Sequence, residues 1–437
     1  MESSSSKIAD NDTKKERGSR EEKIQKLREE IEWKVFGRDK ELEHICGLFR
    51  KRSDAEEISS TSSKPYDVFV IHGIAGSGKS TLAKHICQHE KKAQNKHFHH
   101  VIFSQVSVTF RLDKIFRDML RDIRNDRLSD GKDIESLCYE VKEKIKGKRF
   151  LLVLDDLWVN DKNLMEQEIL LNALGNGENG SIILVTAQRE DAAADLGRQE
   201  RILLCNLEEE VYLSLFMHHA LQCTVDKDHK FERVGRTIVK KLTTAKNLHR
   251  SPMAAVTVAR RLQTKQDISY WESIAKRDML NETMGALWWS YHQLCVDIRR
   301  CFAYCSTFPR GYDLDRDELV HIWIALGLIK TLDNEKEEFE DVGLRYIEEL
   351  LKFSFLQERT TETFTIHDLL HELVERVAGS DILRIDLNGL PKNIPPGCRH
   401  VFIEAKNGAE IAEKIQGLEN LDTLVIEEPI TCTDFLQ

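Results

Sequence analysis

Residues 73–81 constrain the fold of this chain more than any other stretch, because they fit the pattern G-x-x-x-x-G-K-[ST] of a phosphate-binding loop. Four apolar residues, 68–71, precede the loop and predict a buried parallel strand. Residues 82–87 follow it and predict the first turns of a helix. A chance glycine-rich turn lacks this context, so we expect the loop to hold the phosphates of a nucleotide.

Each residue type in this loop suits phosphate chemistry. The three glycines permit backbone angles that let N–H groups turn inward around anionic oxygens. We expect Lys79 to reach the β- and γ-phosphates, Ser80 to ligate Mg²⁺, and Thr81 to approach the α-phosphate. The predicted nucleotide-binding residues of the loop are Gly73, Ile74, Ala75, Gly76, Ser77, Gly78, Lys79, Ser80 and Thr81.

An apolar strand that ends in two carboxylates is predicted at residues 148–156. Such a strand, about 75 residues after a phosphate-binding loop, has the Walker B pattern. We expect Asp155 to hold Mg²⁺ through water and Asp156 to orient the attacking water in catalysis.

Further apolar segments at 101–103, 182–186 and 202–204 predict more strands between helices, which favours a parallel, doubly wound α/β sheet. Residues 206–280 read as helical, and residues 286–305 as one long helix. Asp315 is a predicted helix cap, and helices at 339–353 and 368–378 flank a hairpin at 355–366. Three helices with a hairpin predict a winged helix.

The ends of the chain give weaker patterns. A short amphipathic helix is predicted near residues 20–33. Prolines at 391, 395 and 396 indicate a linker, and Leu418, Leu421 and Leu424 have the spacing of a leucine-rich unit. We therefore divide the chain into a leader at 1–33, a nucleotide-binding domain at 34–205, a helical subdomain at 206–282, a winged helix at 283–380, and a linker with the start of repeats at 381–437.

Charge and composition exclude several classes of function. The chain has 437 residues, with 64 Lys and Arg against 74 Asp and Glu, and residues 281–380 carry 10 against 19. This acidic balance argues against a winged helix that reads DNA, and we expect no nucleic-acid partner. No secretory signal and no run of about 18 apolar residues is evident, so we expect no stable membrane insertion and a cytoplasmic location.

Histidine and cysteine spacing also raises the question of a metal. His85 and His89 are four residues apart with Cys87 between them, and Cys301 and Cys305 have the same separation. Zinc requires four ligands in a tetrahedral array, and no clear set of four emerges. We expect these residues to be core or surface residues.

A series of motifs, in the family's order, resembles the NB-ARC core of plant nucleotide-binding leucine-rich-repeat immune receptors of the coiled-coil type. The resemblance covers residues 35–380, and its most diagnostic stretch is 301–309 together with 323–325. The other motifs lie at 35–38, in the phosphate-binding loop, and at 155–156, 180–186, 250–254 and 366–368. The resemblance identifies the fold as a P-loop NTPase of the STAND class, with a helical and a winged-helix subdomain.

The resemblance implies an ADP/ATP switch. ADP would hold the domains closed, exchange to ATP would open them for self-oligomerisation, and hydrolysis would be slow, so the chain would be at most a slow ATPase. The resemblance places Val35, Phe36, Gly37 and Arg38 near the adenine, together with Pro252, and places His367 on the β-phosphate of ADP. The adenine nucleotide is the expected partner. The sequence does not identify the pathogen effector or immune protein that the receptor would recognise.

The sequence departs from the family in three places. The strand at 180–186 is followed by Gln188 where the family has the arginine that senses the γ-phosphate, and Arg189 comes one place late, so both are candidates for nucleotide contact. Arg250 and Ser251 replace Gly-Leu before Pro252. Both ends read as truncated, because the leader is short for a signalling coiled coil and only the start of a repeat array is present.

Three hypotheses follow. The first is a nucleotide-state switch in plant immunity. The second is a related P-loop ATPase with ordinary turnover. Such an enzyme would hydrolyse ATP about once per second or faster, whereas a switch would hydrolyse it far more slowly. The third is a truncated receptor that acts as a regulator or decoy and does not signal by itself.

Overall fold

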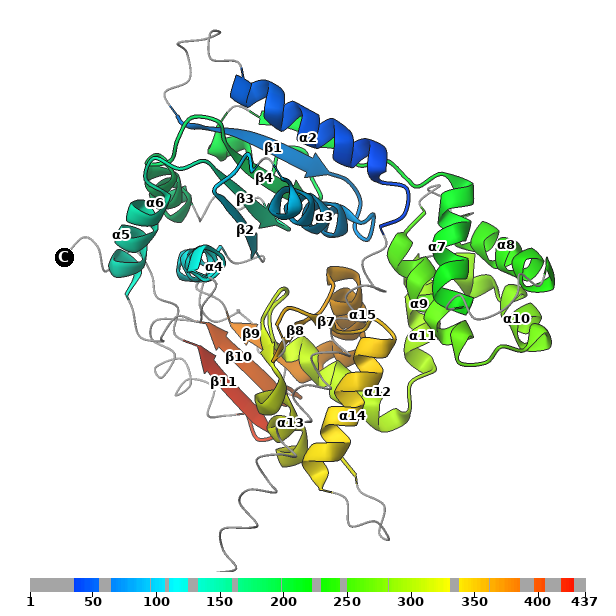
Figure 1. The fold of residues 1–437 in the computed structure, drawn as a ribbon. Coiled ribbons are helices and arrows are strands. Elements are labelled where there is room, and N and C mark those ends of the chain that lie inside the picture. The colour runs from blue at the N-terminus through cyan, green and yellow to red at the C-terminus, as the bar shows by residue number, and fades with distance from the viewer. Residues whose placement is uncertain are drawn as a thin grey trace, which may run out of the picture.

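The structure is a computed structural model (Figure 1). It describes residues 35–54, 64–94, 96–106, 110–124, 133–158, 164–197, 199–221, 229–243, 250–281, 283–330, 338–360, 362–385, 397–404 and 418–427. The helix predicted near residues 20–33 and the prolines at 391, 395 and 396 lie outside these ranges. Within them, no helix has the length and apolar character needed to cross a membrane.

A five-stranded parallel sheet forms the first domain, in the order β2-β3-β4-β1-β5. The strands are β1 (Tyr66–His72), β2 (His100–Gln105), β3 (Phe150–Asp155), β4 (Ser181–Ala187) and β5 (Gln199–Leu203). The strands β3 and β4 are fully buried, as continuous apolar runs in a parallel sheet should be. The predicted α/β sheet is confirmed.

Helices cover both faces of this sheet and leave its carboxyl edge for the functional residues. One face packs against α4 (Leu112–Arg124), α5 (Ile134–Ile145) and α6 (Leu164–Leu174). The other face packs against α2 (Asp39–Asp54) and α3 (Lys79–Lys92). The short helix η2 (Ala194–Leu196) leads from β4 into β5.

A helical subdomain follows, with its own apolar core. It contains α7 (Glu209–Leu221), α8 (His229–Thr243), α9 (Pro252–Gln263), α10 (Ile268–Ala275) and η3 (Asp278–Asn281). The next helix, α11 (Thr283–His292), contributes Trp289 to this core and Leu287 to the core of the winged helix. It therefore joins the two units through buried side chains.

The single helix expected over residues 286–305 is wrong, because α11 ends at His292 and α12 (Val296–Tyr304) begins after a break. The Cys295 thiol accepts a hydrogen bond from the Ile298 N–H at 3.5 Å and so caps α12. Apolar periodicity continues across the break, and for that reason the sequence pattern does not reveal it.

The winged helix itself is confirmed. Its helices are α12, η4 (Cys305–Thr307), α13 (Arg316–Ala325), α14 (Phe339–Lys352) and α15 (Asp368–Ala378), and its small sheet has the order β6-β8-β7, with β6 (Leu314–Asp315), β7 (Gln357–Glu358) and β8 (Thr363–Thr365). Asp315 caps α13 as predicted, accepting hydrogen bonds from the N–H groups of Asp317 and Glu318 at 2.9 and 3.0 Å.

A three-stranded parallel sheet follows, in the order β11-β10-β9, with β9 (Ile382–Ile385), β10 (His400–Glu404) and β11 (Thr423–Glu427). Only η5 (Gly379–Asp381) separates β9 from α15, so a strand begins where a linker is expected. Leu418 and Leu421 pack against the core of this sheet, as the leucine-rich spacing suggests, and Phe402 joins the core of the winged helix. The sheet of β9, β10 and β11 is thereby held against the winged helix.

Candidate functional site

The glycine-rich loop runs from the end of β1 to the start of α3. Gly76 and Gly78 have φ angles of 72° and 94°, a region that favours glycine. A Cβ atom at Gly76 would lie 2.7 Å from the Ser251 hydroxyl and 2.9 Å from a Leu369 methyl carbon. The tip of the loop is therefore in close contact with both the helical subdomain and the winged helix.

Lys79 and Ser77 turn polar groups into the interior of the loop. The Lys79 ammonium donates to the carbonyls of Gly73 and Ile74 at 2.9 and 2.8 Å, and burial lowers the pKa of Lys79. The Ser77 hydroxyl is buried and has no hydrogen-bond partner among the described residues. A buried cation beside an unpaired hydroxyl is an arrangement that an anionic ligand would satisfy.

The two carboxylates after β3 differ in their surroundings. Asp155 is buried, and its carboxylate accepts the Thr186 hydroxyl at 2.5 Å; burial raises the pKa of Asp155, while Thr186, Lys84 and Ser80 lower it. The Asp156 backbone has a φ of 60°, and its N–H donates to the Thr186 hydroxyl at 2.8 Å. β4 thus fixes the turn that carries both carboxylates.

Residues 35–38 lie between the loop and the helical subdomain. The Arg38 guanidinium, 4% exposed, donates to the carbonyls of Ser77 and Cys205 at 3.2 and 2.8 Å. Phe36 packs against the helical subdomain, 5.2 Å from the His218 ring on α7. Val35 is half-buried, and Gly37 has a φ of 62° with no room for a side chain beside Val211.

The N-terminus of α9 meets the loop from the helical subdomain. Pro252 is the first residue of α9, and the Ser251 hydroxyl caps the helix by accepting the Ala254 N–H at 3.4 Å. The same hydroxyl lies 3.5 Å from the Gly76 carbonyl. The serine that replaces the family's leucine therefore links the helix cap to the phosphate-binding loop.

His367 approaches the loop from the winged helix. Its Nδ1 accepts the Leu369 N–H at 3.1 Å, so the proton of the neutral ring is on Nε2. Burial lowers the pKa of His367 to about 4, with Asp156 and Asp155 acting in the opposite direction and Lys79 in the same direction. The neutral ring is thus a hydrogen-bond donor within the electrostatic reach of the loop lysine.

Comparison with known proteins places this arrangement in a family. The family model described as NB-ARC domain matches residues 54–226, and the model described as Disease resistance protein Winged helix domain matches residues 307–374. The chain contains an NB-ARC domain followed by a disease resistance winged helix. The glycine-rich loop and both carboxylates lie in the NB-ARC domain, and His367 lies in the winged helix.

The similar proteins are plant disease resistance proteins. Disease resistance protein RGA2 of Solanum bulbocastanum is 32% identical over 350 residues, and RGA4 of the same species is 33% identical over 352 residues. Each alignment covers 78% of this chain but 34% and 33% of the relatives, so the chain spans about a third of their length. A STAND protein with a tetratricopeptide repeat sensor from Pyrococcus horikoshii aligns over 78% of this chain and 42% of its own, with 16% identity and a TM-score of 0.43.

The NB-ARC match supports nucleotide binding, and the residues at the loop fit that ligand. Gly73, Ile74, Ala75, Gly76, Ser77, Gly78 and Lys79 enclose the buried ammonium and the unpaired hydroxyl described above. Ser80 and Asp155 approach each other closely enough to share a hydrogen bond, which is the oxygen-donor pair that Mg²⁺ prefers. Thr81 is exposed on the first turn of α3.

Gln188 and Arg189, the two candidates for contact with the γ-phosphate, point in different directions. The Gln188 side-chain amide donates to the Asp368 carboxylate at 3.5 Å, so it faces the winged helix. The Arg189 side chain is 72% exposed and pairs with Asp191 at 2.6 Å. Gln188 therefore joins the cluster around Lys79, whereas Arg189 is engaged at the surface.

Asp368 and Thr186 contact the carboxylates at the end of β3, and the sequence alone predicted neither contact. Asp368 faces both Asp156 and Gln188 from the start of α15, and Thr186 bonds to the Asp155–Asp156 turn. The position of Asp368 directly after His367 is a signal for its proximity to the loop. Thr186 lies near the end of β4, which runs beside β3 in the sheet. Its partner depends on the strand order, which no local pattern gives.

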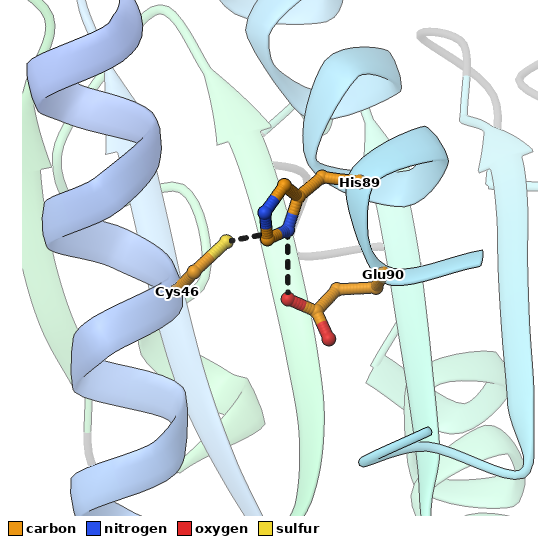
Figure 2. A group of neighbouring side chains, drawn as sticks. All are labelled: Cys46, His89 and Glu90. Atoms are coloured by element: carbon orange, nitrogen blue, oxygen red, sulfur yellow. Dashed lines mark hydrogen bonds and ion pairs between the residues drawn. The ribbon is translucent and has the colours of Figure 1, made fainter. Parts of the chain in front are cut away.

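A second cluster of metal-binding residue types lies between α2 and α3 (Figure 2). Cys46 of α2 meets His89 and Glu90 of α3, and their ligand atoms all lie within 4.8 Å of one another. Among the described residues, the metal-binding neighbours of His89 are thus Cys46 on α2 and Glu90 on α3, and not His85 or Cys87. The sequence expectation considered neighbours along α3 and missed Cys46.

Proposed function

We propose that this chain is the switch core of a plant disease resistance receptor, with an ADP-bound resting state and an ATP-bound active state. The proposal rests on one observation above all: His367 of the winged helix lies within electrostatic range of Lys79 and Asp156 of the NB-ARC domain. A side chain from a separate domain can contact a phosphate at this loop only while the domains are closed. Such a contact gives the closed and open states different affinities for the nucleotide.

The proposed nucleotide contacts follow the geometry. Val35, Phe36, Gly37, Arg38 and Pro252 would surround the adenine side, between the NB-ARC domain and the helical subdomain. The loop N–H groups and Lys79 would hold the phosphates, and Gln188, with Arg189 behind it, would stand nearest the γ-phosphate. The Nε2–H group of His367 is a suitable donor for the β-phosphate of ADP.

Mg²⁺ would be held by Ser80 and Asp155. When bound, it would neutralise the phosphate charge. Asp156 would orient water for a slow hydrolysis that resets the switch, and its position beside Asp155 suits this role. A neutral amide at Gln188 supplies no cation to a developing phosphate charge, which is consistent with slow turnover.

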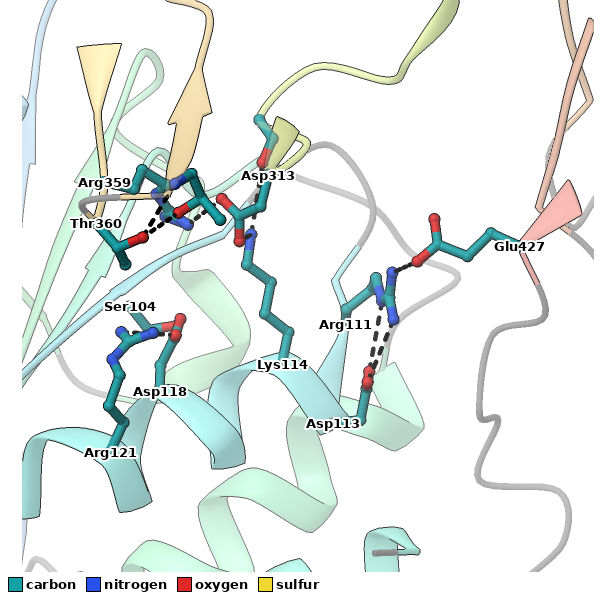
Figure 3. A network of polar contacts seen from close by, with 12 residues as sticks. Ser104, Arg111, Asp113, Lys114, Asp118, Arg121, Asp313, Arg359, Thr360 and Glu427 are labelled. Carbon is teal, nitrogen blue, oxygen red and sulfur yellow. Dashed lines mark hydrogen bonds and ion pairs between the residues drawn. The ribbon is translucent and has the colours of Figure 1, made fainter. Parts of the chain in front are cut away.

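Charged pairs between the NB-ARC domain and the winged helix support a closed resting state (Figure 3). The Lys114 ammonium on α4 lies 3.3 Å from the Asp313 carboxylate, which also accepts from Arg359 at 2.7 Å. Farther along the boundary, Arg111 pairs with Glu427 on β11. The Lys114 and Arg111 contacts join the NB-ARC domain to segments that must move if the domains open, and Arg359 holds Asp313 in place from within the winged helix.

A switch of this kind requires a substantial energetic difference between states. Moving an equilibrium from 1:99 to 99:1 takes about 5.5 kcal/mol of differential binding. The His367 contact and the boundary ion pairs are made in one state only, so together they can supply such a difference. A nucleotide that bound both states with the same affinity could not shift the equilibrium, however tightly it bound.

Two alternative functions make different predictions. A related P-loop ATPase would turn over at ordinary enzyme rates, near one per second or above. A truncated receptor acting as regulator or decoy would bind nucleotide as the switch does but would not signal alone. We favour the switch because the winged helix closes over the loop. We propose a cytoplasmic location, ATP-dependent self-oligomerisation, and immune or pathogen proteins as further partners, and no nucleic-acid partner or stable membrane insertion.

The decisive experiment identifies the nucleotide that copurifies with the protein. Denaturing the purified full chain and separating the supernatant by ion exchange should release ADP in about equal molar amount to the protein. A preparation without nucleotide that also fails to bind ADP at micromolar concentration would overturn the proposal. Fast steady-state ATP turnover would instead favour the ATPase.

A further inference from the structure

A set of three side chains with metal-binding character lies between α2 and the C-terminal end of α3, the end opposite the loop lysine (Figure 2). The Cys46 Sγ atom is 3.7 Å from the His89 Nδ1 atom, and the same Nδ1 atom is 3.2 Å from a Glu90 carboxylate oxygen. Sulfur, nitrogen and oxygen thus converge on one point. From this geometry we infer a binding site for a zinc ion that joins α2 to α3.

The separations match the edges of a tetrahedral zinc site. With Zn–S near 2.3 Å and Zn–N and Zn–O near 2.0–2.1 Å, tetrahedral angles require about 3.6 Å between sulfur and nitrogen and about 3.3 Å between nitrogen and oxygen. The observed distances are 3.7 and 3.2 Å. Two of the three separations thus match a tetrahedral site, and the third, between the Cys46 sulfur and a Glu90 oxygen, is within 4.8 Å.

The charge of the site also favours a divalent cation. The Glu90 side chain is 3% exposed, and among the described residues its one ion pair with a permanent cation is a 3.9 Å contact to Arg50, whose side chain is 54% exposed. Buried carboxylates are usually closely paired or coordinate a metal. A thiolate from Cys46 and the Glu90 carboxylate would together balance the charge of Zn²⁺.

Nucleophilic catalysis does not explain the same three residues. In a Cys–His–acid relay the thiol and the carboxylate bind opposite nitrogens of the imidazole, whereas here both face Nδ1. The Cys46 side chain is 2% exposed, so its sulfur is not accessible for attack on a substrate in solution.

Access to the site comes through His89, whose side chain is 41% exposed. Three protein ligands leave one tetrahedral position for water or another donor on that side. The mixed sulfur, nitrogen and oxygen set suits zinc rather than magnesium or calcium, which prefer oxygen alone. Because α3 begins at Lys79, the ion would fix α2 to the helix that carries the loop lysine.

Cobalt titration tests the site, because Co²⁺ replaces Zn²⁺ and its thiolate complexes absorb by charge transfer. The full chain, treated with EDTA and dialysed, should bind one equivalent of Co²⁺ with a thiolate band that Zn²⁺ abolishes. Co²⁺ at the proposed Mg²⁺ position would give no such band, since Ser80 and Asp155 offer only oxygen. Zn²⁺ should also raise the thermal unfolding midpoint.

Variants locate the ligands. His89→Ala changes an exposed side chain and should fold normally, and Cys46→Ala removes the sulfur. Both variants should lose the thiolate band. Both should also bind the metal at least tenfold more weakly, since loss of an outer-shell partner alone costs about that much. His44→Ala on α2 and Cys205→Ala, two exposed residues outside the cluster, are matched controls and should bind as the wild type does. Absence of a thiolate band in the wild type, or unchanged affinity in His89→Ala, would overturn the inference.

Discussion

The carboxyl groups of Asp156 and Asp368 face each other across the boundary between the NB-ARC domain and the winged helix. Burial and then the Asp368 carboxylate raise the pKa of Asp156 to about 7, while Trp158 and Lys79 lower it. Two like charges from separate domains would oppose closure if both were ionised. In the proposed switch, closure is therefore coupled to a proton on this pair.

This pair predicts that the closed state weakens as the pH rises. The pKa of Asp156 in the closed state is about 7, above the ordinary value near 3.9, so closure retains a proton that the open state releases. The stabilisation is complete below about pH 4 and is lost as the pH rises through 7. Between pH 6 and pH 8 the closed-to-open ratio should fall by about tenfold.

The measurement is the rate of ADP release at pH 6, 7 and 8. Wild type should release ADP about tenfold faster at pH 8 than at pH 6, and Asp156→Asn should lose this dependence. Asp317→Asn, an exposed acid of the winged helix, is the control and should keep the wild-type slope. An identical slope in Asp156→Asn would assign the dependence to other groups.

His367→Ala should open the domains. The variant loses a hydrogen bond from the neutral ring to a charged phosphate, worth about 1.5–3 kcal/mol, or roughly a 10- to 150-fold shift in population. ADP should leave faster by that factor, and the radius of gyration from small-angle scattering should increase. His321→Ala, an exposed histidine on α13, should change neither quantity. Two unchanged readouts in His367→Ala would remove this residue from the proposed lock.

Lys79→Arg should abolish nucleotide binding. The ammonium fits between the Gly73 and Ile74 carbonyls at 2.9 and 2.8 Å, a space too small for a planar guanidinium. Isothermal titration with ADP provides the affinity. Lys91→Arg, an exposed lysine at the end of the same helix, should bind as the wild type does. Wild-type affinity in Lys79→Arg would contradict the role of the loop lysine.

Much of the site could be predicted because its parts are local in sequence. The glycine-rich loop, the strand that ends in Asp155 and Asp156, and the cap at Asp315 each depend on neighbours a few residues away. The pairing of Asp156 with Asp368 joins residues more than two hundred positions apart, and no local pattern encodes it. The break before α12 is not predictable for two further reasons: apolar periodicity continues across it, and a thiol rarely caps a helix.

The ion pair between Lys114 and Asp313 gives a final prediction about closure. The two groups come from separate domains and lie 3.3 Å apart, with side chains 20% and 36% exposed, so solvent weakens their attraction. We expect Lys114→Ala and Asp313→Ala each to speed ADP release about fivefold, equivalent to about 1 kcal/mol. The double variant should release ADP no faster than the more affected single variant, because both changes remove one shared contact.

A matched pair within one subdomain separates closure from general stability. Arg236 on α8 and Glu210 on α7 lie 2.5 Å apart, and both helices belong to the helical subdomain, so this ion pair does not cross a domain boundary. Arg236→Ala should therefore leave ADP release unchanged. If the effects of Lys114→Ala and Asp313→Ala were additive, the two side chains would act separately and not as a bridge. If neither variant released ADP faster, this pair would have no part in holding the winged helix closed over the loop.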